Sequence, residues 1–304
     1  MTTHEPSWDL YRTFLAVLTE GSLSGAARKL GLTQPTVGRH IDALEQTLAL
    51  ALFTRSQTGF IPTEAALALQ NHAQMLESSS AALLRAASGL GHGPDAPVRG
   101  TVRITASEII SVEVLPPILT RLRRTHPGLT LELAPSNRIE NLLRRDADIA
   151  VRMQRPEQDV LVARRLGEIE LGMHAHRDYL KHHGVPRNWK EMADHSLIGI
   201  DRETAFTRSL QHKLGGLERE AFALRSDNDL VHLAAIRAGF GIGICQVGLA
   251  QRDKALTRVL PKLMSIRLEV WLAMHENLRS NPACSVVYAA LAKGLAQYIE
   301  TSAG

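Results

Sequence analysis

Hydrophobic residues recur every three or four positions through the first ninety residues of the chain, which is the spacing of amphipathic helices. This spacing predicts one helix over residues 9–19 and two shorter helices, joined by a tight turn, within residues 22–45. The side chains expected to face inward on these helices are Leu10, Phe14, Val17, Leu18, Ala26, Ala27, Leu30, Val37, Ile41 and Leu44. The N-terminal part is therefore expected to be a small helical unit.

The turn between the two short helices has residues suited to ending one helix and starting the next. Gly31 accepts the left-handed conformation that closes a helix, and Leu32 is expected to plug the corner. Thr33 is a good N-cap, and Pro35 fits the first helical turn, where backbone N–H groups lack partners. The side chains left facing outward at the start of the second helix are Gln34, Thr36, Arg39 and His40. A helix presented in this way fits the major groove of B-DNA, which predicts a helix-turn-helix.

A hairpin is predicted directly after these helices. Residues 50–53 begin a strand, residues 58–59 supply a Thr-Gly turn, and residues 60–61 return. Such a hairpin is a wing, whose tip can lie on phosphate or in the minor groove. Arg55 and Gln57 are the expected wing contacts to DNA.

A long helix rich in alanine and leucine is predicted over residues 64–89. Its larger side chains include Leu67, Leu69, His72, Leu76, Leu83 and Leu84. So much apolar surface on a helix without a partner in its own small domain favours pairing with a second copy of the chain. The Gly- and Pro-rich stretch 89–97 is expected to be a hinge.

From residue 99 onward the pattern changes to alternating strands and helices. The predicted strands are 101–105, 129–134, 147–152, 164–175, 197–200, 221–225, 242–245 and 268–275. The predicted helices are 112–125, 137–145, 205–214, 228–238 and 283–300. This alternation is typical of an α/β fold.

Four short motifs carry a resemblance to a known family. They are Ala26-Ala27-x-x-Leu30, Thr33-Gln34-Pro35, Ile41-x-x-Leu44-Glu45 and Leu52-Phe53-x-Arg55. Together they resemble the N-terminal signature of LysR-type transcriptional regulators, and the length and layout of the rest of the chain also fit that family. With the outward-facing positions above, the expected DNA-binding residues are Ser22, Arg28, Thr33, Gln34, Pro35, Thr36, Arg39, His40, Arg55 and Gln57.

Two positions depart from the family pattern. The family usually has Ser where this chain has Gly38, and that hydroxyl often contacts DNA phosphate. It usually has Gly where this chain has Ala49, at the end of the recognition helix. Gly38 within a helix should cost about 1 kcal/mol relative to alanine. Ala49 in a left-handed cap should be strained by about 1 kcal/mol.

The resemblance also implies how the chain is divided. The expected domains are a winged helix-turn-helix over 1–63, a linker helix and hinge over 64–97, and an effector-binding domain over 98–304. The last resembles a periplasmic solute-binding fold, with subdomain I at 98–174 and 276–300 and subdomain II at 175–275. It implies a small-molecule co-inducer in the cleft between the subdomains, and homodimers that pair into tetramers. No other cofactor is expected.

Polar side chains follow several of the predicted strands, where ligands gather in open α/β sheets. The candidate effector-binding residues are Ser107, Glu108, Ser136, Asn137, Arg152, Asp201, Asp227 and Asn228. Hydroxyls, amides and helix N–H groups suit a small polar effector, most simply a carboxylate, with Arg152 or the nearby Arg155 supplying the charge. Each single residue also has an ordinary structural reading, as an N-cap for the Ser and Asn residues and as a turn or cap for the two Asp residues.

Charge, cysteine content and hydropathy bear on which partners, compartment and metal sites the sequence predicts. The chain carries a net charge of +4, yet residues 1–90 hold six Lys or Arg against seven Asp or Glu, so bulk charge gives no support to DNA binding. Cys245 and Cys284 make no disulfide scaffold, which favours a reducing cytoplasm. No apolar run approaches the ~20 residues of a membrane helix. His174-x-His176 lacks a third ligand, so no metal site is expected.

The sequence therefore predicts a cytoplasmic, sequence-specific DNA-binding regulator whose promoter binding is modulated by a small molecule, and not an enzyme. The alternative is a cytoplasmic α/β small-molecule-binding protein or enzyme with a helical appendage for protein contacts. Residues 22–45 discriminate between the two, because a solute receptor has no use for a helix-turn-helix.

Overall fold

The structure is a computed structural model that describes residues 5–56, 59–89, 97–137, 146–156, 161–202, 204, 208 and 215–302. The chain forms two compact units. The first comprises Met1–Leu84 with Glu140–Asp146, and the second comprises Arg85–Ile139 with Ala147–Gly304. The predicted domain and subdomain boundaries stay predictions.

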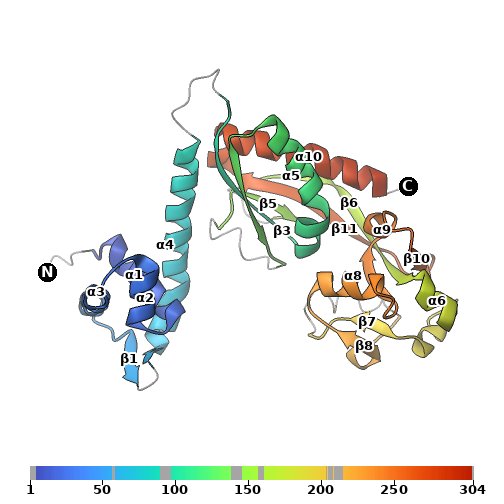
Figure 1. Ribbon diagram of the computed structural model, residues 1–304, viewed down its shortest axis with the longest axis horizontal. Coiled ribbons are helices and arrows are strands. Elements are labelled where there is room, and N and C mark those ends of the chain that lie inside the picture. The colour runs from blue at the N-terminus through green and yellow to red at the C-terminus, as the bar shows by residue number, and fades with distance from the viewer. Residues whose placement is uncertain are drawn as a thin grey trace. The chain divides into compact units, whose positions relative to one another are not determined.

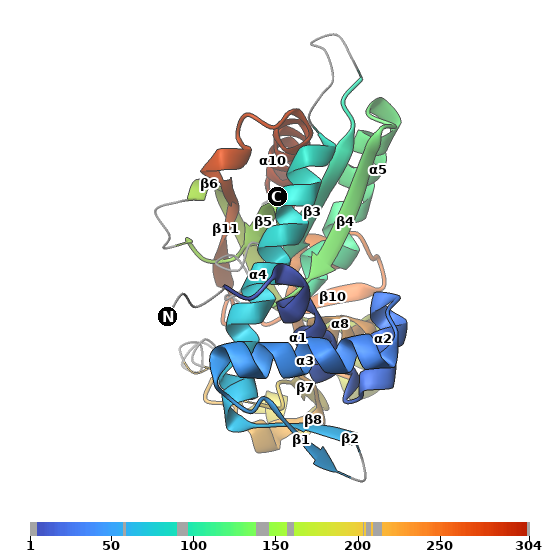
Figure 2. The ribbon, with the colours of Figure 1, turned by 90° about the vertical axis from the view of Figure 1, so that its left-hand side faces the viewer.

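The first unit is helical, as the hydrophobic spacing predicts. Its elements are α1 (Trp8–Glu20), α2 (Leu23–Leu30), α3 (Gln34–Leu48), the hairpin strands β1 (Phe53–Ser56) and β2 (Gly59–Pro62), and α4 (Glu64–Ser88) as far as Leu84 (Figures 1 and 2). The predicted inward residues Phe14, Val17, Ala26, Ala27, Val37, Ile41 and Leu44 are buried in one cluster, and Leu10, Leu18 and Leu30 pack against it. The hydrophobic spacing was therefore enough to predict this core.

The corner between α2 and α3 is closed by backbone rather than by Leu32. Gly31 adopts the expected left-handed conformation, with φ 67°. The Leu32 N–H donates to the carbonyl of Ala27 at 3.0 Å, which completes the helix end. Since the Leu32 side chain is 39% exposed, the prediction that it plugs the corner is wrong.

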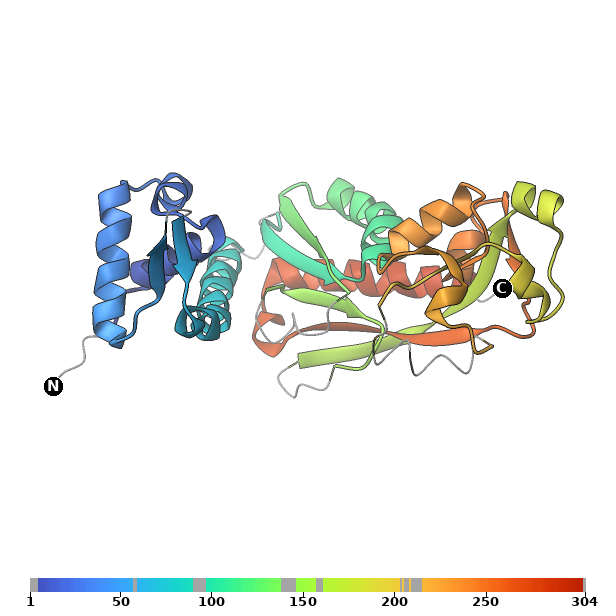
Figure 3. The ribbon, with the colours of Figure 1, turned by 90° about the horizontal axis from the view of Figure 1, so that it is seen from below.

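The second unit is built on a seven-stranded sheet. Its strands are β3 (Gly100–Ala106), β4 (Leu129–Pro135), β5 (Ile149–Arg152), β6 (Leu161–His176), β9 (Gly243–Gln246), β10 (Leu256–Val259) and β11 (Ile266–His275). The order is β10-β6-β11-β5-β3-β4, and β9 also pairs with β6. Strand β3 runs parallel to β4 and β5, whereas β6 and β11 are antiparallel and lie side by side along the unit (Figure 3).

Helices and a smaller sheet complete this unit. A π-helical turn (Ile110–Val114), α5 (Leu115–Thr125) and α10 (Pro282–Ser302) adjoin the large sheet, and their apolar side chains share one core with it. The remaining elements are α6 (Arg177–His183), β7 (Leu197–Gly199), β8 (Phe222–Arg225), α8 (Asp229–Arg237) and α9 (Val247–Ala250), with short 3-10 turns at Glu191–Asp194, Arg219–Ala221 and Glu276–Leu278. Strands β7 and β8 pair in parallel.

All eight predicted strands are present, and the α/β reading is confirmed. The sequence missed β10, α6 and α9, which are only four to seven residues long. The predicted helices 137–145 and 205–214 lie almost wholly outside the described residues. Among the helices that the structure describes, none combines the length and apolar character needed to cross a membrane.

His174 and His176 lie at the C-terminal end of β6, as predicted. His174 is 2% exposed on β6, where its Nδ1 lies 2.9 Å from the carbonyl oxygen of Gly172 and 3.3 Å from Cys245 Sγ. Within the described ranges, no three His, Cys, Asp or Glu side chains are placed to hold a metal ion. Burial raises the thiol pKa of both Cys245 and Cys284 to about 12, so neither is a thiolate at neutral pH.

Acid should destabilise the chain through His174. Burial lowers the pKa of His174 from 6.5 to about 4, so between these values the unfolded chain binds a proton that the folded chain does not. The free energy of unfolding should therefore fall by about 2 kcal/mol between pH 7 and pH 5 on account of this group. Urea unfolding of the wild type, of His174→Gln and of the exposed control His182→Gln at both pH values checks this. A His174→Gln variant with the wild-type pH dependence would contradict it.

Candidate nucleic-acid interface and effector site

Side-chain caps fix the start of both helices of the helix-turn-helix. Ser22 Oγ accepts a hydrogen bond from the N–H of Gly25 at 3.1 Å, at the start of α2. Thr33 Oγ1 accepts from the N–H of Thr36 at 3.4 Å, at the start of α3. The hydroxyls of Thr33 and Thr36 are also 2.8 Å apart. These predicted DNA-binding residues therefore set the geometry of the turn, whatever else they contact.

The first turns of α3 present polar side chains outward. Gln34, Pro35 and Arg39 are exposed, and Thr36 is half-buried. The guanidinium of Arg39 donates to Thr36 Oγ1 at 3.3 Å, and Gln34 Oε1 accepts from Ser24 at 3.0 Å. Amide, hydroxyl and guanidinium groups on one helical face are the groups that read base edges and phosphates in a major groove. Arg28, on α2, is also exposed.

His40 is held differently from its neighbours on α3. It is half-buried, and its Nδ1 lies 2.8 Å from Thr13 Oγ1 of α1. Since Thr13 is itself 1% exposed, the ring is tied to the core of the unit at one edge. A hydroxyl partner 27 residues away in the sequence gives no local signal, so sequence reasoning missed this contact.

The wing is joined to α3 by a carboxylate that sequence reasoning also missed. Glu45 Oε1 accepts from the N–H groups of Leu52 at 2.6 Å and Phe53 at 3.1 Å, which fixes where β1 begins. On β1, the exposed Arg55 lies over the Phe60 ring, 5.8 Å from its centroid. Gln57, the other predicted wing contact, lies outside the described residues.

The two departures from the family pattern have clear structural consequences. A Cβ at Gly38 would lie 3.8 Å from Leu23 Cδ1, an ordinary contact, so a larger residue fits there. Ala49 ends α3 with φ 54° and ψ 35°, the left-handed conformation expected for this position. Its N–H still bonds the carbonyls of Gln46 and Glu45, so the cap forms despite the strain on an alanine.

Replacing Ala49 with glycine should therefore raise the free energy of unfolding by about 1 kcal/mol, because glycine adopts positive φ without the Cβ penalty. The greater freedom of glycine in the unfolded chain offsets part of the gain. Chemical unfolding of Ala49→Gly and of the matched Ala51→Gly, at a position without positive φ, measures the effect. Equal destabilisation by both substitutions would contradict the strain at Ala49.

In the second unit, Arg152 combines deep burial with incomplete pairing. It ends β5 and is 9% exposed. Its guanidinium donates to the carbonyl of Val151 at 3.0 Å and to Thr105 Oγ1 at 3.2 Å, while Nε has no partner within the described part of the chain. Burial alone lowers the pKa of Arg152 from 12.5 to about 10, with no charged neighbour contributing. A buried cation without a carboxylate is a site that an anion can complete.

Other predicted effector residues lie at the same strand edge. Because β3, β4 and β5 are parallel, the residues that follow them share the carboxyl edge of the sheet. Ser107 follows β3, and its Oγ is buried with no hydrogen-bond partner among the described residues. Ser136 follows β4 and continues the ladder by donating its N–H to Ala106 at 2.8 Å. The edge thus carries an unpaired hydroxyl as well as the guanidinium.

A polar network connects this edge to the start of α8. Glu108 accepts from the Asn228 amide at 2.7 Å, and the Glu108 N–H donates to Asn137 Oδ1 at 3.1 Å. Asn228 Oδ1 caps α8 by accepting from the N–H groups of Leu230 and Val231. Three of the predicted residues, which the sequence places up to 120 positions apart, are therefore brought together.

The remaining candidates have partners of their own. Asp227 Oδ1 accepts from the N–H groups of Asp201 at 3.1 Å and Arg202 at 2.8 Å. Asp201 in turn pairs with Arg219 at 2.5 Å. These contacts join separate segments of the second unit, so they are neither helix caps nor local turns. Arg155 is exposed and lies over the Trp271 ring at 5.7 Å.

Two protein-family descriptions match the chain. Residues 8–67 match "Bacterial regulatory helix-turn-helix protein, lysR family". Residues 95–296 match "LysR substrate binding domain". The HTH-type transcriptional regulator PgrR of Escherichia coli is 26% identical over 258 residues, which cover 82% of this chain and 85% of PgrR. CrgA of Neisseria meningitidis serogroup C is 28% identical over 62% of this chain and 61% of CrgA.

Solved structures show the same fold. Full-length AphB, a virulence activator of Vibrio cholerae and member of the LTTR protein family, superposes with a TM-score of 0.60 at 20% identity, covering 95% of this chain and 99% of AphB. CrgA, a LysR-type transcriptional regulator from Neisseria meningitidis, gives a TM-score of 0.56 at 20% identity, covering 99% of this chain and all of that one. At this identity the likeness concerns the fold alone.

Proposed function

We propose that this chain, which belongs to the LysR-type family of transcriptional regulators, binds specific promoter DNA through α3 and the wing. The observation that carries the proposal is the exposed face of α3, where Gln34 and Arg39 stand clear of the buried core. Thr33 and Thr36 position this face through their hydroxyls. Arg39 and Gln34 would contact base edges or phosphates, and Arg55 would contact the backbone.

We infer that the effector is a small anion, most simply a carboxylate, bound at Arg152. A carboxylate there would pair with the buried guanidinium and accept from the unpaired Ser107 hydroxyl. Glu108 and Asn137 would line the polar side of the same site. Asp201 and Asp227 would support the loop near Asn228 rather than contact the effector.

The chain is proposed to act as a dimer that pairs into tetramers, through α4 and the second unit. Ala66 and Ala73 of α4 are buried, whereas Leu76 and Leu83, seven residues apart on one face, are 46% and 69% exposed. Apolar side chains in this pattern are stable when a second copy covers them. Two copies of α3 would then reach successive major grooves, about 34 Å apart.

We place the protein in the cytoplasm, where a promoter-binding regulator meets chromosomal DNA. A regulatory role without catalysis agrees with the family to which the chain belongs. The alternative is an α/β enzyme or small-molecule-binding protein with a helical appendage. It would require turnover of a small molecule, or binding of one that does not change the affinity for DNA.

Replacing Arg39 by alanine tests the proposed DNA contact. The wild type should protect one region of the DNA that flanks its own gene. Arg39→Ala should weaken this binding by about 1–3 kcal/mol, roughly 5- to 150-fold. Arg12→Ala, an exposed arginine on α1, is the matched control and should bind as the wild type does. Footprinting titrations of the three proteins at one salt concentration give the affinities. Unchanged affinity for Arg39→Ala would remove α3 from the proposed interface.

A further inference from the structure

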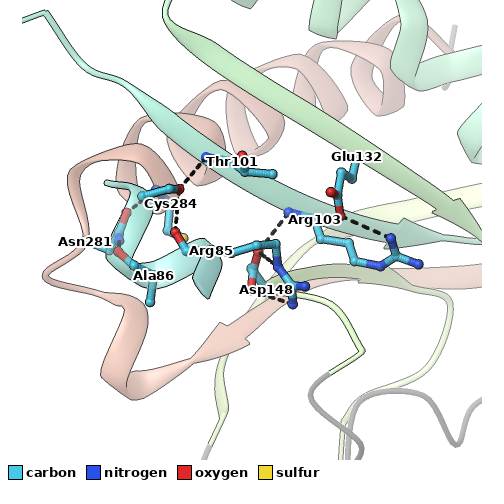
Figure 4. A network of polar contacts seen from close by, with 9 residues as sticks. Arg85, Ala86, Thr101, Arg103, Glu132, Asp148, Asn281 and Cys284 are labelled. Atoms are coloured by element: carbon cyan, nitrogen blue, oxygen red, sulfur yellow. Dashed lines mark hydrogen bonds and ion pairs between the residues drawn. The ribbon is translucent and has the colours of Figure 1, made fainter. Parts of the chain in front are cut away.

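The last turn of α4, residues 85–88, belongs to the second unit and is held within it by several hydrogen bonds (Figure 4). Ser88 Oγ accepts from the N–H of Thr101, at the start of β3, at 2.9 Å. The Asn281 amide donates to the carbonyl of Ala86 at 3.3 Å, while its Oδ1 accepts from the N–H of Cys284 at 3.0 Å. The end of the linker helix is therefore held from both β3 and the start of α10.

An ion pair lies at the centre of this attachment. The Asp148 carboxylate accepts from Arg85 Nε at 2.9 Å and from Arg85 Nη2 at 3.2 Å. It also accepts from the backbone N–H of Arg103 at 2.8 Å. The two charged side chains are only 10% and 3% exposed. A bidentate, buried ion pair of this kind has one preferred geometry, so a small shift of either partner weakens its hydrogen bonds.

Asp148 directly precedes β5, and Arg152 ends it. Strand β5 has only four residues, and the three between Asp148 and Arg152, namely Ile149, Ala150 and Val151, are 0% exposed. At about 3.3 Å per residue, the two ends are about 13 Å apart. A short strand packed on all sides moves as a unit, because a close-packed interior transmits displacement rather than absorbing it.

The neighbouring strand β3 contacts both ends of this element. The backbone of Arg103 makes two hydrogen bonds with Asp148: its carbonyl accepts from the Asp148 N–H at 2.8 Å, and its N–H donates to the Asp148 carboxylate at 2.8 Å. Two residues further along β3, Thr105 Oγ1 accepts from Arg152 at 3.2 Å. Strands β3 and β5 thus contact the Arg152 guanidinium of the proposed effector site at one end, and at the other end the Asp148 carboxylate that binds Arg85 of α4.

We propose that the Arg85–Asp148 ion pair couples the Arg152 site to the DNA-binding unit, with β5 as the connecting element. A change at Arg152 displaces β5 against β3, and the displacement alters the hold of Asp148 on the last turn of α4. The inference rests on the proposed function in one respect, namely that an anion at Arg152 is the natural cause of this change. The coupling itself belongs to the protein and is measurable without any ligand.

Hydrogen–deuterium exchange on the full chain, without DNA or ligand, tests the coupling. The perturbation is Arg152→Met. It should change the exchange rates of the amides of residues 86–89 by at least about threefold, and the change should disappear in an Asp148→Asn background. Arg85→Lys, which keeps the charge but loses the two-pronged geometry, serves as a second background should Asp148→Asn fail to fold. Arg103→Gln is the matched control background, in which the effect of Arg152→Met should persist. The Arg103 side chain pairs with Glu132 rather than with Asp148, and the backbone contacts of Arg103 remain in the variant.

A double-mutant cycle on DNA affinity extends the test to function. Distant substitutions without shared partners normally combine within about twofold. Arg152→Met and Arg85→Lys should deviate from the product of their separate effects by more than threefold, whereas Arg152→Met and Arg103→Gln should not. Unaltered exchange at residues 86–89, or a change that persists without the ion pair, overturns the coupling. A chain that binds no DNA selectively contradicts the proposed function instead, and the exchange result still decides the coupling.

Discussion

Replacing Arg152 by methionine is expected to weaken carboxylate binding strongly and, at the same time, to stabilise the folded chain. The guanidinium is buried, its Nε is unpaired, and burial lowers its pKa to about 10, so the folded state holds a charge that it does not compensate. Methionine has a similar length and no charge. Replacement of a buried ion pair by apolar residues is often neutral or stabilising by about 1–4 kcal/mol, and removal of a buried charge without a counter-ion should stabilise the fold for the same reason. Loss of the charge-assisted contact should weaken carboxylate binding by about 100-fold.

Thermal unfolding with and without sodium acetate, succinate and benzoate measures both effects. The wild-type melting temperature should rise with at least one of these probes, as binding to the folded state requires. Arg152→Met should melt at a higher temperature than the wild type without a probe and should not respond to any of them. Arg155→Met is the matched control, because Arg155 is exposed and lies over Trp271, and it should keep the wild-type response. An Arg152→Met variant that melts at a lower temperature than the wild type, but still gains stability with a carboxylate, would show that Arg152 stabilises the fold and does not bind the effector.

Introducing aspartate at both Leu76 and Leu83 is expected to separate the chains and to reduce DNA affinity by at least about 100-fold. These leucines are 46% and 69% exposed on one face of α4, so the isolated chain tolerates polar groups there. In a self-paired helix, the four introduced charges would be buried against one another, which costs several kcal/mol. A single copy of α3 would then bind alone, without the gain in effective concentration that a second copy supplies.

Sedimentation or light scattering measures the mass of the double variant in solution, and DNA titration measures its affinity. Glu77→Gln, an exposed change beside the leucines on the same helix, should leave both the mass and the affinity unchanged. A Leu76→Asp/Leu83→Asp chain with the mass of the wild type would show that the exposed leucines of α4 do not hold the copies together.

The sequence was most informative where structure depends on nearby residues. The helix-turn-helix follows from local rules: glycine at Gly31, a hydroxyl cap at Thr33 and apolar spacing at Val37, Ile41 and Leu44. The left-handed conformation of Ala49 could be anticipated for the same reason. Leu32 was misplaced because the backbone closes the corner without help from a side chain.

Contacts between distant residues account for what the sequence did not reveal. Strand-end rules identified Arg152 but not its burial or pairing, because its partner Thr105 lies 47 positions away on another strand. The hydrogen bond between His40 and Thr13, and those from the wing backbone to Glu45, likewise form only when distant parts of the chain pack together. The same rules grouped Asp201 and Asp227 with the effector residues but did not reveal their partners, because Asp227 bonds the backbone N–H of Asp201, 26 positions away, and Asp201 pairs with Arg219. Arg85 and Asp148 gave no sequence signal, since a buried ion pair between a helix end and a strand start has no local motif.

Selective binding to duplex DNA is the measurement that tests the account most directly. The full chain is titrated with a labelled fragment flanking its own gene and with random duplex of equal length, at moderate salt, because non-specific affinity depends steeply on salt. The account predicts that the flanking fragment is bound at least about 1,000-fold more tightly than random duplex. Equal affinity for the two duplexes would contradict it.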